Sequence, residues 1–196
     1  MTAMSGGRHG MGRIARAALI AAAIGLAACA GASYVVPYYA VGYTPGEEAG
    51  AGLDMPVVVR GNAFAMPQPA FDQAVTDAMQ GWAFRLPLHF TPLGNPNAVY
   101  RVVMVFNPPT AVADPAYCLR PLPVQAVFGL PPAPRTPLTA VFCRGDGVLA
   151  SASGSVSTAQ GPFSPEFREG IGHFTAALFP AVNPENRPDT CFGMFC

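Results

Sequence analysis

The chain has 196 residues with 11 arginines, no lysine and 11 acidic residues, so its formal net charge is 0. Charged residues make up 11% of the sequence, against about 25% in an average globular protein. A chain without basic clusters is a poor candidate for binding nucleic acid, and we expect no nucleic-acid partner. The length suffices for one domain with a buried core, in which the 22 prolines separate the periodic segments.

The amino-terminal segment has the pattern of a secretion signal. Arg13 and Arg16 precede an apolar run over residues 17–28, which ends in the small residues of a cleavage site. The run is far shorter than the about 20 apolar residues of a membrane-spanning helix. We therefore expect residues 1–28 to be a signal peptide, with translation starting at either Met1 or Met11.

The end of this run, Leu26-Ala27-Ala28-Cys29, resembles the lipobox of bacterial lipoproteins. The resemblance implies cleavage before Cys29, diacylglycerol on its sulfur and a fatty acid such as palmitate on the new amino terminus. The chain would then be anchored to a membrane of the cell envelope. Ala30 stands where an aspartate retains enterobacterial lipoproteins at the inner membrane, so we expect the outer membrane, facing the periplasm. The alternative is an unmodified thiol after an ordinary cleavage site.

Residues 29–56 are predicted to be the lipidated amino terminus and a flexible tether. Glycine and proline recur there, and neither a helical nor a strand period persists. Four tyrosines are unusual in a spacer, so the alternative is an aromatic segment at the bilayer surface or folded back onto the domain. They are Tyr34, Tyr38, Tyr39 and Tyr43.

The folded domain is predicted to span residues 57–182 and to begin with a strand over 57–60, which ends at the turn Gly61-Asn62. A helix follows, with Asp72 and Asp77 on its solvated side and Trp82 as a core anchor at the end of its apolar stripe. The stripe is formed by Phe71, Ala74, Val75, Ala78, Met79 and Trp82.

Four further strands are predicted. Residues 98–106 are almost continuously apolar, broken only by Arg101, as expected of a central strand covered on both faces. Residues 121–129 and 137–143 form two strands joined by a proline-rich loop. Residues 148–156 form the last, with small apolar residues on one face and a solvated polar face made by Ser151, Ser153 and Ser155.

A second helix has clear local signals. Ser164 can cap it, Pro165 suits its first position, and Glu166 favours the positive end of the helix dipole. Gly170 and Gly172 would let it approach the sheet closely. Its apolar stripe is Phe167, Ile171, Phe174 and Leu178, Pro180 ends it, and residues 183–196 are a carboxy-terminal tail.

These elements predict an α+β fold in a single two-layer domain. The expected architecture is a mostly antiparallel sheet of about five strands with two helices on one face. The first strand and the strand at 98–106 can be parallel, joined through the first helix by a right-handed crossover.

Four cysteines remain besides Cys29, and an even number in an exported chain favours disulfides. If the loop before residue 137 closes a hairpin, Cys143 returns beside Cys118. We therefore predict the pairs Cys118–Cys143 and Cys191–Cys196. No C-x-x-C motif is present, and we expect neither a metal nor a cofactor.

No catalytic motif occurs in the sequence, and we expect no enzymatic activity. The three serines could in principle join His173 with Asp146 or Glu169 in a hydrolase, but no spacing brings them together. We interpret His173 as partly buried and structural, and His89 as a loop residue that could sense pH.

These observations predict a membrane-anchored, non-enzymatic lipoprotein whose periplasmic domain binds an envelope protein. The expected contact surfaces are the loops 107–123 and 130–137 and the polar strand 148–157. The alternatives are a carrier of a small ligand or lipid, which would use a cleft between the helices and the sheet, and an uncharacterised hydrolase.

Overall fold

The computed structural model describes residues 35–48, 54–84, 86–92, 98–109, 114–119 and 133–186. Cys29, Cys191, Cys196 and the strand predicted at 121–129 lie outside these residues. None of the helices in the described ranges has the length and apolarity needed to cross a bilayer.

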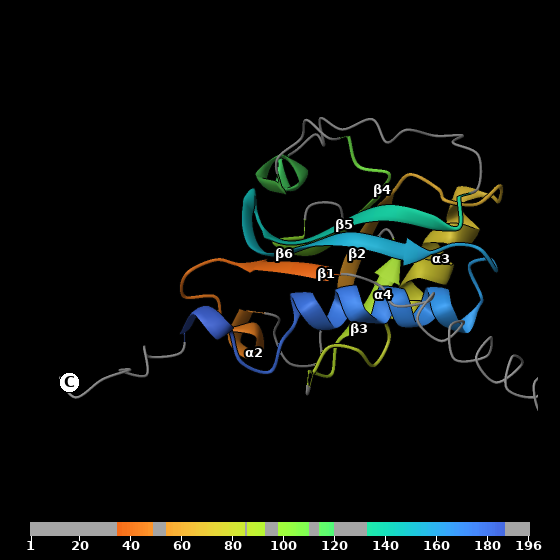
Figure 1. The fold of residues 1–196 in the computed structure, drawn as a ribbon. Coiled ribbons are helices and arrows are strands. Elements are labelled where there is room, and N and C mark those ends of the chain that lie inside the picture. Colours follow the sequence, from red (N-terminus) through yellow and green to blue (C-terminus); the bar gives the residue numbers. More distant parts are fainter. Residues whose placement is uncertain are drawn as a thin grey trace, which may run out of the picture. The chain divides into compact units, whose positions relative to one another are not determined.

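The described residues form an α+β fold around one six-stranded mixed sheet, which confirms the predicted fold class (Figure 1). The strand order is β1-β6-β5-β4-β2-β3. The strands are β1 Val35–Tyr39, β2 Asp54–Arg60, β3 His89–Pro92, β4 Tyr100–Phe106, β5 Arg135–Arg144 and β6 Gly147–Ser157.

Two long helices form the second layer. They are α3 Gln68–Met79 and α4 Pro165–Leu178. α4 packs on β1, β5 and β6, α3 packs on β2 and β3, and the two helices contact each other. The described residues also form three short helices: α2 Pro45–Glu48, and the 3-10 helices η1 Asp114–Cys118 and η2 Pro184–Asn186.

The strand β2 pairs in parallel with β4, with Val57 opposite Val102, as the crossover through the first helix predicted. β2 also pairs in parallel with β3, which the sequence did not predict. At the end of β2, Gly61 has φ +77, and a Cβ there would lie 2.5 Å from the carbonyl oxygen of Phe106. Only glycine fits this turn, since both its backbone angle and its closeness to β4 exclude a side chain.

The interpretation of residues 35–48 as part of a flexible tether is wrong. Val35–Tyr39 forms β1, an edge strand paired antiparallel to β6. The hydroxyl group of Tyr39 donates to the carbonyl oxygen of Ala177 at 2.9 Å, and that of Tyr43 donates to the carbonyl oxygen of Leu178 at 2.8 Å. Both rings are buried, so this segment is folded onto the domain by its aromatic side chains.

The main core lies between the sheet and the helices. It is rich in aromatic residues, and rings from the strands and helices meet edge to face or stacked, as for Phe71 and Phe106 with centroids 4.8 Å apart. The fully buried phenylalanines of this core are Phe71, Phe90, Phe106, Phe142, Phe167, Phe174 and Phe179.

A smaller core covers part of the opposite face of the sheet. Val103 and Val105 of β4 point to that face and pack with Tyr117 and Cys118 of η1. The alternate residues of β4 point into the main core, so both faces of this strand are covered, as its continuous apolarity predicted. In Figure 1, η1 is the green turn on the side of the sheet away from α4.

The disulfide Cys118–Cys143 is confirmed, and it attaches η1 to β5. Next to it, the buried Arg101 lies opposite Cys143 in the pairing of β4 with β5. Its guanidinium donates to the carbonyl oxygens of Cys118 and Gly145, the latter at 2.9 Å. The one charged residue of the predicted central strand therefore links η1, the disulfide and the β5–β6 turn.

Candidate functional site

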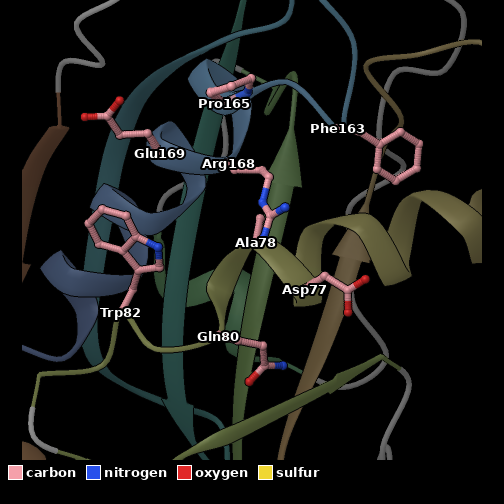
Figure 2. Close-up of a pocket in the computed structure, with 8 residues that line it drawn as sticks. All are labelled: Asp77, Ala78, Gln80, Trp82, Phe163, Pro165, Arg168 and Glu169. Atoms are coloured by element: carbon pink, nitrogen blue, oxygen red, sulfur yellow. The ribbon is translucent and has the colours of Figure 1, made fainter.

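A groove lies where the end of α3 meets the start of α4, with a volume of about 510 Å³. We call it the α3–α4 groove. Figure 2 shows side chains from both helices and from the loops beside them around it. They are Asp77, Ala78, Gln80, Trp82, Phe163, Pro165, Arg168 and Glu169.

Trp82 forms one wall of the groove, and its prediction as a core anchor is wrong. The helix ends at Met79 because Gly81 takes φ +78, so Trp82 leaves the apolar stripe. The side chain is 37% exposed. The predicted apolar stripe extended one turn too far, because the helical spacing of apolar residues continues past Gly81, the glycine that ends the helix.

The indole of Trp82 is held in place by α4. A Cβ on Gly172 would lie only 2.1 Å from an indole carbon, so the ring packs directly on the glycine backbone. The ring of His173 meets the indole at 87°, with centroids 5.6 Å apart. Gly172 was predicted to let α4 approach the sheet closely, but the group that packs on its backbone is the indole of Trp82.

Phe163 lines the groove from the loop before α4 and is 71% exposed. Ser164 caps the helix as predicted, since its hydroxyl oxygen accepts from the amide of Phe167. A residue just before the cap often packs against an apolar residue at the fourth helical position. Here that position is Arg168, so the Phe163 ring has no apolar partner of this kind and stays exposed. Phe163 was not among the residues predicted from the sequence, although this pattern could have indicated it.

The charges of the groove come from three side chains. Asp77 accepts a hydrogen bond from the amide nitrogen of Gln73 at 2.7 Å, and it lies on the solvated side of α3 as predicted. Glu169 lies 3.8 Å from Nε2 of His173, which is exposed and not partly buried as predicted. With Arg168 the groove carries mixed charge beside two exposed aromatic rings.

The other predicted solvated carboxylate is buried. Asp72 is 5% exposed and accepts a hydrogen bond from Gln68 at 2.6 Å. Burial raises the pKa of its carboxyl, while the bond from Gln68 and the charge of Arg60 lower that pKa. The prediction of a solvated Asp72 was wrong because the face of α3 that packs against the rest of the domain is wider than its apolar stripe.

The structure does not bring the serines together with His173. Ala150 and Ala152 of β6 point into the core beneath α4, so the intervening serines point to the other face of the sheet. Ser151 is buried there and donates to Asp114 at 2.5 Å, contrary to its prediction as a solvated residue. His173 lies on the helix layer, on the opposite side of the sheet.

His89 lies at the start of β3 and not in a loop, and its Nδ1 is 2.8 Å from a carboxylate oxygen of Asp54. Both side chains are exposed. In the described ranges, no cluster of three or more histidine, cysteine or acidic side chains could hold a metal ion.

Two of the predicted contact surfaces, the proline-rich loops, lie only partly within the described residues. Residues 110–113, 120–123 and 130–132 of the two proline-rich loops lie outside the described residues. On the third surface, β6, η1 covers Ser151, while Ser153 shares a hydrogen bond of 3.2 Å with Thr139 and stays partly exposed.

No protein-family model matches the chain, and no curated protein matches it significantly. Two solved structures of PelC dodecamers from Paraburkholderia phytofirmans, one of them a variant, resemble it distantly. The variant gives a TM-score of 0.42 at 10% identity, and the other gives 0.40 at 13% identity. Each match covers 76% of this chain and 98% of that chain. These values are too low to assign this chain a family or a function.

Proposed function

We propose that this chain is a lipid-anchored protein of the bacterial cell envelope whose folded domain binds an envelope protein through the α3–α4 groove. The observation that carries the proposal is the exposure of Trp82 and Phe163 beside Arg168 in one groove. Tryptophan and arginine are among the residues that dominate binding energy at protein interfaces, and aromatic residues in general are enriched there.

The way Trp82 is held supports a binding role. Its indole packs on the Gly172 backbone and against the edge of His173, which limits its motion before a partner arrives. A ring that is already fixed loses little conformational entropy on binding. The low overall content of charged residues also favours a protein that covers part of its surface with a partner.

The cell-envelope part of the proposal is supported by the lipobox-like sequence that ends at Cys29. An outer-membrane anchor facing the periplasm fits Ala30 after that cysteine, and a disulfide between Cys118 and Cys143 fits an oxidising compartment. In this proposal the domain acts without catalysis, as an accessory or binding protein held at the membrane by its lipid.

A small-ligand carrier is the second candidate, because the groove volume of about 510 Å³ lies within the range of ligand sites. The groove lies between the two helices, whereas the cleft predicted from the sequence would lie between the helices and the sheet. A carrier would gain thermal stability from a lipid or metabolite, and the gain would be lost in Trp82→Ala.

Site-specific photo-crosslinking in living cells tests the protein-partner proposal. A photoreactive phenylalanine analogue in place of Phe163 is expected to capture a distinct envelope protein. The matched control is the same analogue at Val99, which is also exposed but lies next to the β5–β6 turn. Trp82→Ala should abolish the adduct at position 163. A membrane-anchored chain that yields no protein adduct there, or the same adduct at both positions, would contradict the proposal.

A further inference from the structure

The edge strand β1 exposes apolar side chains on one side. Val36 is 50% exposed and Tyr38 is 60% exposed, and they alternate with residues that face the helix layer. Val41, in the turn that follows the strand, is 96% exposed. We call these three residues the β1 patch.

The chain between Cys29 and β1 is very short. Only residues 30–34 separate Cys29 from Val35. At no more than about 3.6 Å per residue, the six Cα–Cα steps span at most about 22 Å. A lipid on Cys29 would therefore keep Val35, the first residue of β1, within about 22 Å of the anchored residue, whatever path the chain takes between them.

The chemistry of the segment suits a membrane interface. No charged residue occurs between Arg16 and Glu47, so β1 and its turn can approach the headgroups without removing a charge from water. Tyrosine is enriched at this depth because its ring is apolar and its hydroxyl group is polar. The carboxylate of Asp114 on this side accepts a hydrogen bond from Ser151, which lies opposite Tyr38 in the strand pairing.

We propose that the β1 patch lies against the bilayer surface, an inference that rests on the lipid anchor proposed above. Val36 and Tyr38 leave the sheet on the face opposite α3 and α4. The α3–α4 groove is then directed away from the lipid and stays open to a partner. The contact depends on the anchor and on apolar side chains, so it needs no anionic lipid and changes little with salt.

Fluorescence quenching by lipid tests this orientation. The lipidated full-length chain is reconstituted into phosphatidylcholine vesicles with an increasing fraction of brominated acyl chains. In a Trp82→Phe background, Tyr38→Trp and Val36→Trp are each expected to lose most of their fluorescence. The wild-type chain is the control, since Trp82 lies on the helix layer and its emission should stay unchanged.

Intact mass of the same preparations separates this inference from the anchor. With a lipid mass on Cys29, unquenched tryptophan at both β1 positions would overturn the proposed orientation and leave the anchor standing. Quenching of Trp82 equal to that at β1 would overturn it as well. Without a lipid mass on Cys29, the anchor fails and this inference fails with it.

Discussion

Trp82 packs so closely on Gly172 that a single methyl group added at this glycine is expected to change the stability of the protein. Alanine at an exposed helix position is more favourable than glycine by about 1 kcal/mol. At Gly172, however, the new Cβ would lie 2.1 Å from the indole, which must move. We expect Gly172→Ala to lower the free energy of unfolding by about 1–3 kcal/mol, as overpacking does. It should also make Trp82 more accessible to a soluble quencher.

The matched control removes the ring. In a Trp82→Ala background, Gly172→Ala should stabilise the protein by up to about 1 kcal/mol, because only the helix preference remains. A stabilising effect in both backgrounds, measured by urea unfolding, would show that the indole does not rest on this glycine.

Asp72 and Asp77 offer a second comparison between single residues on α3. Each accepts a hydrogen bond from a glutamine four residues earlier, at 2.6 Å and 2.7 Å, but only the Asp72 residue is buried. Burial raises the pKa of Asp72, so the folded protein binds this proton more tightly than the unfolded chain does. The stabilisation that comes from this tighter proton binding is fully present when the pH is below the pKa of Asp72 in the unfolded chain. It is lost as the pH rises through the pKa of Asp72 in the folded protein.

Asp72→Asn keeps the acceptor for Gln68 and removes the charge. We expect the variant to be more stable than the wild type at neutral pH, and this gain to shrink as the pH falls into the range where carboxylates are protonated. Asp77→Asn should show little change, as is usual for an exposed residue. Urea unfolding over a pH series measures both. A gain for Asp72→Asn that does not depend on pH would contradict the assignment.

At the scale of elements, η1 depends on the disulfide that ties it to β5. It is a 3-10 helix of five residues that contacts β5 and β6, and its Tyr117 and Cys118 pack with Val103 and Val105 of β4. Cys118 and Cys143 are separated by 25 residues, and closing a loop of that length stabilises by about 3 kcal/mol in the chain-entropy model.

We expect Cys118→Ala/Cys143→Ala to lower the free energy of unfolding by about this amount. Local unfolding should increase most on the side of the sheet that η1 covers, where Val103 and Val105 of β4 are buried. Hydrogen exchange of β4 amides and denaturant unfolding measure these effects. Equal exchange throughout the sheet would argue against a local role for the pair.

The elements also differ in how far the sequence predicted them. The start of α4 was predicted by its cap, proline and glutamate, because these signals act within one turn. β1 and β3 were missed because they are short, contain Pro37 and Pro92, and become strands through pairing with distant residues. The pairing Cys118–Cys143 was predicted, although one of the two strands used to argue for it lies outside the described residues.

At the scale of the whole molecule, the α+β class, the two helices on one face and the parallel pairing of β2 with β4 followed from the order of the periodic segments. The groove did not. It depends on the end of α3 and on the contact of Trp82 with Gly172, two residues 90 positions apart in sequence, so it exists only once the chain has folded.

The proline in each outer strand of the sheet has a consequence for assembly. Pro37 lies in β1 and Pro92 in β3, the two edges, and neither can donate a backbone hydrogen bond to an added strand. Natural proteins use this device to stop sheets from joining edge to edge. Growth of this sheet into fibrils or by strand exchange is therefore disfavoured, and two copies of the chain would meet through side chains rather than by extending the sheet.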